Sequence, residues 1–404
     1  MPLAKASKIT LAGMPHQLPP PSPEALKHSG ELTSLIRQRI RDAGGWIRFG
    51  DYMDLALYAP GLGYYSAGSC KFGEGGDFVT APELSALFSR CIAGQCREVL
   101  AQIDSGVILE LGAGTGRMAA DILLELEALD ALPAQYLILE LSADLRARQQ
   151  QTLEQRAPQL ADRVEWQNQL PQEPLPAVIL ANEVIDALPV ERFSISDDGL
   201  MELGVSCSAS GFAWVAQPAG QDLSSAVDEL QALLGQGLAA GLTSEIRLRL
   251  PAWMTALAHS LQQGLLLFID YGLSRREYYD RARSTGTLRC HYRHRAHADP
   301  FAWPGLQDIT AWVDFSQLAD AAEQAHLQVS GYTTQANFLI GAGLDRQLER
   351  AAVADLTAQV DQAGQARRLV MPGEMGETFK AMALTRGPVT LPSGFAGKDL
   401  RRTL

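Results

Sequence analysis

The segment "VILELGAGTGRMAADIL", residues 107–123, carries the strongest fold signal in this chain. Its first five residues are almost all apolar, which is typical of a short strand buried on both faces of a sheet. Glycines then alternate with other residues, and the pattern that follows is helical. Glycines at a strand-to-helix turn let the backbone approach a ligand, and the start of the helix adds free amide donors. The segment therefore predicts a ligand-binding turn, with candidate residues Glu110, Gly112, Gly114 and Gly116.

Two further residues narrow the kind of ligand. The dinucleotide fingerprint G-x-G-x-x-G, started at Gly112, needs glycine or alanine at position 117, and this chain has Arg117. This weighs against a nucleotide-dependent oxidoreductase, which we keep as an alternative. Glu140 ends the next predicted strand, where a carboxylate can accept hydrogen bonds from both hydroxyls of a ribose. A solvated glutamate at a strand end is the competing interpretation.

Several more apolar runs predict the rest of the sheet. Runs at 136–141, 177–182 and 265–272 alternate with helical patterns, which indicates a doubly wound α/β fold with a parallel core sheet. Between about 190 and 262 this alternation stops. Three short strands at 191–196, 200–206 and 212–217, joined by "DDG" and "SASG" turns, predict an inserted β meander followed by a helix. We expect a helix near 314–326 and final strands at 328–334 and 378–384.

The N-terminal part is predicted to be helical. Residues 1–30 are rich in proline and are expected to form a flexible tail. Apolar spacing predicts one helix at 31–44 and another at 84–103. Thr80 and Glu83, with Pro82 between them, have the spacing of a capping box. We therefore divide the chain into a tail, a helical extension with an active-site loop at 31–105, and a catalytic domain at 106–404.

Composition limits the partners and the compartment. Hydrophobic residues make up 47% of the chain and charged residues 20%, as in ordinary globular proteins. The formal net charge of −12 disfavours binding to nucleic acid and to anionic membranes. No apolar stretch is long enough for a membrane span, so we expect a soluble, cytoplasmic protein. The five cysteines lack the spacing of a disulfide framework or a zinc site, which favours a reducing compartment.

Carboxylates follow another predicted core strand. In "AVILANEVIDALPVERF", residues 177–193, Asn182, Glu183 and Asp186 come directly after the buried run. Ligands of open α/β sheets bind at the carboxyl ends of the strands, so these side chains are candidates for the reaction site. In the alternative interpretation Asn182 caps a helix and the two acids form its solvated first turn.

A glycine-rich segment supplies further acids. "FGEGGDFVTAPE", residues 72–83, places three glycines before Asp77 and then the segment from Thr80 to Glu83. The proposed capping box accounts for Thr80 and Glu83, but it does not explain the carboxylate of Asp77.

Six motifs, in this order, resemble the MidA family: "GLGYYS" at 61–66, "FGEGGDFVTAPELS", "LELGAGTGRMAADIL", "ANEVIDALPVERF", "IDYG" at 269–272 and "PGLQDITAWVDF" at 304–315. The resemblance covers about residues 31–385 and is loosest in the insertion. It implies a class I, Rossmann-like methyltransferase fold with a seven-stranded sheet, S-adenosylmethionine as cofactor, and relationship to a mitochondrial assembly factor of respiratory complex I that methylates arginine. In a eukaryote the compartment would then be the mitochondrial matrix.

The resemblance also assigns roles to residues. It implies a cofactor site formed by Glu110, Gly112, Gly114, Gly116, Glu140 and Thr80, and a methyl-transfer cleft lined by Asp77, Glu83, Asn182, Glu183 and Asp186. Because a guanidinium group is a planar, charged fork, paired carboxylates can bind two of its nitrogens and orient the third. We expect Glu183 or Asp186 to form this clamp and to receive the proton lost on methylation.

Alternatives within this resemblance stay open. The chain could be a catalytically idle assembly scaffold with a methyltransferase fold, or it could methylate a small molecule. The preferred partner is a protein that presents an arginine, and a homodimer is a further hypothesis.

Other side chains are weaker candidates. The histidines of "RCHYRHRAHADP", residues 289–300, are interleaved with arginines, which opposes metal binding, so we expect no metal site there. A mobile loop that grips an acidic partner or arranges the cleft is the favoured interpretation. Tyr64, Tyr65, Trp303 and Trp312 could flank an acceptor side chain, although core packing explains most such aromatic residues.

Overall fold

The computed structural model describes residues 18–66, 80–208, 211–351 and 356–404. Its centre is a sheet in the order β15-β16-β10-β5-β2-β3-β4, and the short β14 (Val313–Asp314) pairs with the end of β10. The neighbours from β10 to β4 run parallel, whereas β16 is antiparallel to β10 and β15. The seven strands of the path confirm the predicted sheet. Their bounds are β2 Val107–Leu111, β3 Tyr136–Leu139, β4 Val164–Gln167, β5 Leu175–Asn182, β10 Leu261–Leu273, β15 Gln328–Thr334 and β16 Phe379–Arg386.

Helices cover both faces of this sheet, as the apolar strand runs require. Successive side chains of a strand point to opposite faces, and Ile108 and Leu109 of β2 accordingly join two different hydrophobic clusters. On the Ile108 face lie α4 (Ala86–Leu100), α5 (Arg117–Ala128) and α6 (Ala143–Arg156), with α11 (Gln335–Gly341), α12 (Leu344–Ala351) and α13 (Leu356–Val370) further along. On the Leu109 face lie α8 (Leu250–His259) and α10 (Phe315–Gln324). The sheet is therefore buried on both sides.

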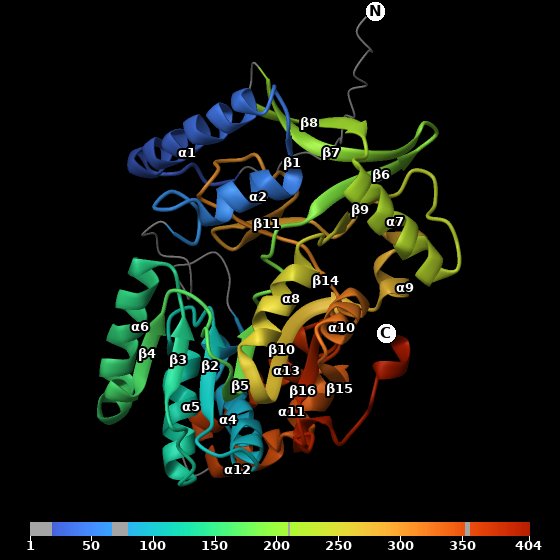
Figure 1. Cartoon of the computed structure of the whole chain (residues 1–404). Helices are drawn as coiled ribbons and strands as arrows, with labels where there is room; N and C mark the ends of the chain where they lie inside the picture. Colours follow the sequence, from blue (N-terminus) through green and yellow to red (C-terminus); the bar gives the residue numbers. More distant parts are fainter. Residues whose placement is uncertain (1–17, 67–79, 209–210, 352–355) are drawn as a thin grey trace, which may run out of the picture.

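A second unit stands over the large sheet (Figure 1). The predicted meander forms, as β6 (Glu191–Ser196), β7 (Gly199–Ser208) and β8 (Gly211–Pro218), and α7 (Gln221–Leu234) follows it. Two strands that the sequence did not indicate, β1 (Ile47–Arg48) and β9 (Thr243–Ile246), complete this antiparallel sheet by pairing with β7 and β6. The helices α1 (Pro23–Asp42) and α2 (Phe49–Tyr58) pack with it.

The predicted boundaries need three corrections. Helix α1 begins at Pro23, inside the segment predicted as a tail, because Ser22 caps it by accepting a hydrogen bond from the Ala25 amide at 3.2 Å. The segment 31–105 is not one unit, since α1 and α2 join the second unit whereas α4 packs on the large sheet. The insertion ends before α8, which is a helix of the main core.

Three local predictions were also wrong. The helix expected at 84–103 is interrupted at Ser85, which is extended (φ −157°) and separates α3 (Ala81–Leu84) from α4. Thr80 makes no capping bond with its side chain, so no capping box forms there. The segment expected as a polar loop contains a hairpin of β11 (Arg289–Tyr292) and β12 (Arg295–His297), and β11 also pairs with β13 (Asp308–Thr310).

The described ranges contain neither a candidate membrane span nor a group of metal-ligating side chains. None of their helices has the length and apolar character of a membrane span. Among the same residues, no three or more histidine, cysteine or acidic side chains gather as metal ligands.

Candidate active site

The glycine turn adopts backbone angles that favour glycine. Gly112, Gly114 and Gly116 have φ values of +65°, +54° and +83°, in the left-handed region that other residues rarely enter. A side chain added at Gly112 would meet only Val184 Cγ2 at 3.8 Å. One added at Gly116 would lie 2.9 Å from the Cα of Gln149. Gly112 therefore leaves room for a ligand, whereas Gly116 allows α6 to pack closely against the turn.

Glu140 follows β3 and is held beside this turn. Its buried carboxylate accepts hydrogen bonds from the Ser142 amide at 2.9 Å and from Gln149 Nε2 at 3.0 Å. Gln149 Nε2 also donates to the Gly114 carbonyl at 3.1 Å, and its Oε1 accepts from Trp166 Nε1 at 2.8 Å. The sequence reasoning missed Gln149, because a glutamine within a helix carries no motif signal.

Glu110 lies inside the sheet. Its carboxylate accepts a hydrogen bond from the Tyr136 hydroxyl at 2.6 Å and is almost completely buried. Burial raises the pKa of Glu110 to about 7, and the nearby charge of Glu140 adds to this effect. The cofactor role assigned to Glu110 stays a prediction.

The segment from Thr80 to Glu83 connects the glycine turn with the second group of candidates. The Glu83 carboxylate accepts a hydrogen bond from the Thr115 hydroxyl and pairs with Arg117 at 3.7 Å. The backbone of the neighbouring Ala81 hydrogen-bonds to Glu183. Glu83 thus contacts the glycine turn, and Thr80, which is half-buried, lies beside Ala81. Asp77 lies outside the described residues.

The ends of β5 and β10 bring acids from distant segments together. The two strands are paired up to Asn182 and Ile269, so Glu183 and Asp270 follow at neighbouring positions. Oδ2 of Asp270 accepts hydrogen bonds from the amides of Ile185 at 3.0 Å and Asp186 at 3.1 Å. Oδ1 of Asp270 accepts a hydrogen bond from the amide of Tyr271. Glu183, Asp186, Asp270 and the buried Asp308 together form what we call the acid cluster.

Burial raises the pKa of three acids of the cluster, Glu183, Asp186 and Asp270. It raises the pKa of Glu183 to about 8, with a further contribution from the charge of Asp186. It also raises the pKa of Asp186, and that of Asp270 far above the ordinary value. Glu183 has a φ of +52°, which is unusual for a residue with a side chain and indicates local strain. A cation bound here would allow the acids to ionise.

The buried Arg247 acts electrostatically on Asp186 and Asp270 of the acid cluster. Its guanidinium group, however, donates its hydrogen bonds to backbone carbonyls. It donates to the carbonyls of Ile185 at 3.0 Å, Asp186 at 3.3 Å and Trp312 at 2.8 Å. These bonds hold the loop after β5 against the segment that precedes β14. Within the described ranges, buried Oδ1 atoms of Asp186 and Asn182 have no hydrogen-bond partner. The cluster therefore has unused acceptors, which suits a ligand rich in donors.

Tyrosines surround the acid cluster. The Tyr271 hydroxyl donates to Asp186, and the Tyr65 hydroxyl donates to Asp308 at 2.9 Å. The ring of Tyr58 stacks on Tyr65 with centroids 5.5 Å apart, and Trp312 lies edge to face with Tyr271 at 6.4 Å.

The four aromatic candidates from the sequence therefore divide into two pairs. Tyr65 and Trp312 adjoin the acid cluster, as described above. Tyr64 is a buried core residue, and Trp303 packs against Tyr292 with ring centroids 5.1 Å apart. Sequence reasoning did not select Asp270, Asp308, Tyr58 or Tyr271, although the quoted motif "IDYG" contains two of them.

The sheet order and the glycine turn with Glu140 are the features of a class I methyltransferase. The model of the family described as "Putative S-adenosyl-L-methionine-dependent methyltransferase" matches residues 91–333, and the chain belongs to this family. A crystal structure from Burkholderia thailandensis bound to S-adenosyl-homocysteine superposes with a TM-score of 0.90 and 42% identity, covering 96% of this chain and 100% of that chain.

Curated relatives cover nearly the whole chain. "Protein arginine methyltransferase NDUFAF7 homolog, mitochondrial" from Caenorhabditis elegans is 26% identical over an alignment 417 positions long, which covers 94% of this chain and 94% of the relative. The protein of the same name from Drosophila melanogaster is 27% identical, covering 92% of this chain and 89% of the relative. The protein is a methyltransferase that uses S-adenosylmethionine. The oxidoreductase and the idle scaffold are thereby set aside.

The residues of the glycine turn fit this cofactor. Gly112 presents backbone without an obstructing side chain, and each oxygen of the Glu140 carboxylate can accept more than the one hydrogen bond described. The cofactor would therefore be held by Gly112, Gly114 and Glu140. Gln149 fixes Gly114 and Glu140 by hydrogen bonds, and Gly116 lets α6 pack closely against the turn. When bound, the cofactor supplies an electrophilic methyl group on a sulfonium.

Proposed function

We propose that the protein is an arginine N-methyltransferase that acts on a protein acceptor. The observation that supports this most is in the acid cluster, where Asp186 Oδ1 and Asn182 Oδ1 have no hydrogen-bond donor among the described residues and burial raises the pKa of Glu183 to about 8. A guanidinium group supplies both a positive charge and five N–H donors. The names of the curated relatives point to the same acceptor.

The acid cluster has two tasks in this proposal. The first is to bind the guanidinium, with Glu183 or Asp186 accepting hydrogen bonds from two nitrogens so that the third is free to react. The stacked Tyr58 and Tyr65 would flank the cation with their rings. Because Tyr271, Asp270 and Arg247 hold Asp186 and its backbone in place, the guanidinium meets a preorganised site.

The second task is to remove a proton. Methylation would form a bond between nitrogen and carbon while the carbon–sulfur bond of the donor breaks and leaves a neutral thioether, and the same nitrogen must lose a proton to avoid a second positive charge. Glu183, with a pKa raised to about 8, holds a proton more strongly than an ordinary carboxylate does, so it is a better acceptor once it is ionised. We assign it the role of general base.

The identity and location of the acceptor are finer proposals. From the resemblance to complex I assembly factors we propose a subunit of a respiratory complex I type enzyme as acceptor. The curated relatives are named as mitochondrial, so they lend no support to the cytoplasmic location expected above. The homodimer also stays a hypothesis, which sedimentation analysis can check.

The direct test is to incubate the protein with S-adenosylmethionine labelled in the methyl group and a matching cell extract. We expect label in one or a few protein bands and, after complete acid hydrolysis, in methylarginine. Label confined to the small-molecule fraction, or to an amino acid other than arginine, would contradict the proposal and favour the small-molecule alternative or another side chain.

A further inference from the structure

A pocket of about 860 Å3 lies beside the acid cluster and is not used by the mechanism above. Its wall includes Leu273 at the end of β10, Thr334 at the end of β15, Lys380 at the start of β16, and Trp312. Its volume falls in the range of ordinary ligand sites. Trp312 also contacts Tyr271, whose hydroxyl bonds to Asp186, so one ring connects the pocket with the acid cluster.

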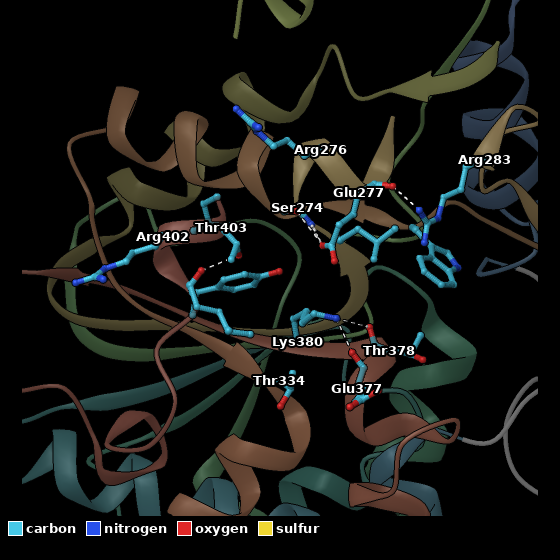
Figure 2. A pocket seen from close by; sticks show the side chains of 15 residues that line it. Ser274, Arg276, Glu277, Arg283, Thr334, Glu377, Thr378, Lys380, Arg402 and Thr403 are labelled. Atoms are coloured by element: carbon cyan, nitrogen blue, oxygen red, sulfur yellow. Dashed lines mark hydrogen bonds between the residues drawn. The ribbon is translucent and has the colours of Figure 1, made fainter. Parts of the chain in front are cut away.

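The charge of the pocket is opposite to that of the whole chain. Four basic residues line it, Arg276, Arg283, Lys380 and Arg402, against the two acids Glu277 and Glu377, whereas the chain as a whole carries −12. In Figure 2, Arg276 and Arg402 extend outward at the top and at the left of the pocket, and Lys380 lies near the middle of the view. This arrangement attracts an anion to the rim and continues the attraction inward.

Glu277 acts on Lys380 from a distance, but its carboxylate is also tied to a structural task. Its Oε2 accepts hydrogen bonds from the Ser274 amide at 3.1 Å and the Ser274 hydroxyl at 2.8 Å, which forms the capping box of α9 (Arg275–Tyr278). These donors occupy the oxygen that faces the start of the helix.

Lys380 is the most informative residue of the pocket. Lys380 is only 8% exposed. Its Nζ donates hydrogen bonds to the backbone carbonyls of Glu377 at 2.5 Å and Thr378 at 3.4 Å. Among the residues the structure describes, no carboxylate lies within ion-pair distance of it. Glu277 and Glu377 act on this ammonium only from beyond ion-pair distance, so an anion in the pocket would give the buried charge a direct counter-ion. Burial correspondingly lowers the pKa of Lys380.

We propose that this pocket binds an acidic segment of the polypeptide acceptor, next to the arginine that is methylated. The inference rests on the proposed function. A chain with its arginine in the acid cluster and a neighbouring aspartate or glutamate in the basic pocket would place each charge against its complement. Trp312 lines the pocket and its ring contacts Tyr271, which hydrogen-bonds to Asp186, so a short stretch of polypeptide that follows these two rings would reach both sites.

The test uses two fluorescein-labelled peptides that contain one arginine, followed by four glutamates in one and four glutamines in the other. Fluorescence anisotropy measures their binding to the full-length protein with S-adenosyl-homocysteine present. We expect the glutamate peptide to bind at least about tenfold more tightly, and the preference to shrink with added salt.

Variants locate the binding site. Arg276→Glu combined with Arg402→Glu changes only exposed rim residues and should remove the preference for glutamate. Lys380→Met should weaken binding of the glutamate peptide alone, and a thermal melt shows whether this buried substitution is folded. Arg281→Glu is the matched control, because it reverses an exposed charge nearby that does not line the pocket. Equal binding of both peptides, or the same loss in the control, would overturn the inference.

The two proposals can fail separately. Preferential binding of the glutamate peptide without methylation of either peptide supports the pocket and counts against arginine as acceptor. Methylation of both peptides with equal affinity supports arginine as acceptor and rejects the acidic-segment site.

Discussion

The glycine turn and the acid cluster lie at the same edge of one sheet but are built in different ways. The turn and its supports come from one stretch, residues 107–149, and its buried groups are largely paired with one another. The acid cluster and the tyrosines around it collect residues from around 58–65, 183–186, 270–271 and 308, and the segment 182–186 keeps acceptors without a hydrogen-bond partner among the described residues. The proposed cofactor site is therefore formed mainly by one continuous stretch of backbone. The proposed acceptor site is assembled from distant segments, and its acceptor atoms need a ligand to complete their hydrogen bonds.

We expect substitutions in the acid cluster and substitutions around the glycine turn to change different measured quantities. Substitutions in the acid cluster should reduce turnover or acceptor binding and leave cofactor affinity intact. Substitutions around the glycine turn should reduce cofactor affinity, and stability where packing is tight.

The largest effect is expected for Glu183→Gln. It removes the proposed base and one arm of the clamp but keeps the size of the side chain, so turnover should fall about a thousandfold or more. Calorimetry should find cofactor affinity nearly unchanged. Glu173→Gln, at an exposed position, is the control. Unchanged turnover in Glu183→Gln would remove this residue from the mechanism.

Gly116→Ala should have the next largest effect. The added Cβ would lie 2.9 Å from the Cα of Gln149, so α6 must move and Glu140 with it. We expect cofactor affinity to fall by tens of fold and the free energy of unfolding to drop by about 3 kcal/mol. Gly235→Ala also has a positive φ but meets no atom within 4 Å, so it isolates the backbone strain. Equal losses of stability in both variants would show that the contact with α6 is unimportant.

Asp270→Asn tests whether the hydrogen bonds of Asp270 position the loop that carries Asp186. An asparagine side chain has only one acceptor oxygen, whereas both carboxylate oxygens of Asp270 accept hydrogen bonds. At least one of the amides of Ile185, Asp186 and Tyr271 therefore loses its partner. An unpaired buried donor costs about 1–3 kcal/mol, so acceptor kcat/KM should fall about tenfold to a hundredfold. Asp280→Asn, at an exposed position, should have no such effect. A loss of cofactor affinity as large as the loss of kcat/KM would contradict the separation of the two sides.

The pH dependence should differ between the two sides as well. Glu183, with a pKa of about 8, is protonated at pH 6.5 and ionises as the pH rises. Acceptor kcat/KM should therefore increase up to about tenfold per pH unit and level off above pH 8 to 9. Cofactor affinity, measured by calorimetry across the same range, should change much less. A flat profile for kcat/KM would exclude Glu183 as the base.

The same shifted groups predict how stability changes with pH. Glu110 and Glu183 have pKa values of about 7 and 8 in the folded protein, above those of an unfolded chain. The folded state therefore binds more protons than the unfolded state between about pH 4.5 and 8, and the free energy of unfolding should decrease as the pH rises through this range. Chemical denaturation at several pH values, compared between the wild type and Glu183→Gln, measures the share that Glu183 contributes.

The smallest effect is expected for Gln149→Met. The variant keeps the volume but loses the hydrogen bonds to Glu140, Gly114 and Trp166. Cofactor affinity should fall several-fold, since each such bond contributes about 1 kcal/mol at most to holding Glu140. Gln150→Met, one position along α6 and exposed, should leave affinity unchanged. A loss of turnover without a loss of affinity would place Gln149 on the acceptor side.

Errors in the sequence prediction occurred where distant residues compete for a side chain. The spacing of Thr80 and Glu83 suggested a capping box, but Glu83 binds Thr115 and Arg117, which lie on the glycine turn. Ser85 then caps α4 instead, by accepting a hydrogen bond from the Leu87 amide at 3.3 Å. The capping box of this protein forms at Ser274 and Glu277, where no such competitor draws the glutamate away.

The sequence by itself determined the strands of the large sheet, the glycine turn, Glu140, and the acids that follow β5. These features follow from properties that act over a few residues: the burial of apolar runs, the backbone freedom of glycine and the place where a parallel strand ends. Only the tertiary structure decided that Asp270, Asp308, Tyr58 and Arg247 join Glu183 and Asp186, and that Gln149 supports Glu140. Hydrogen bonds and charge interactions of this kind depend on distances across the fold, and no local pattern of residues encodes them.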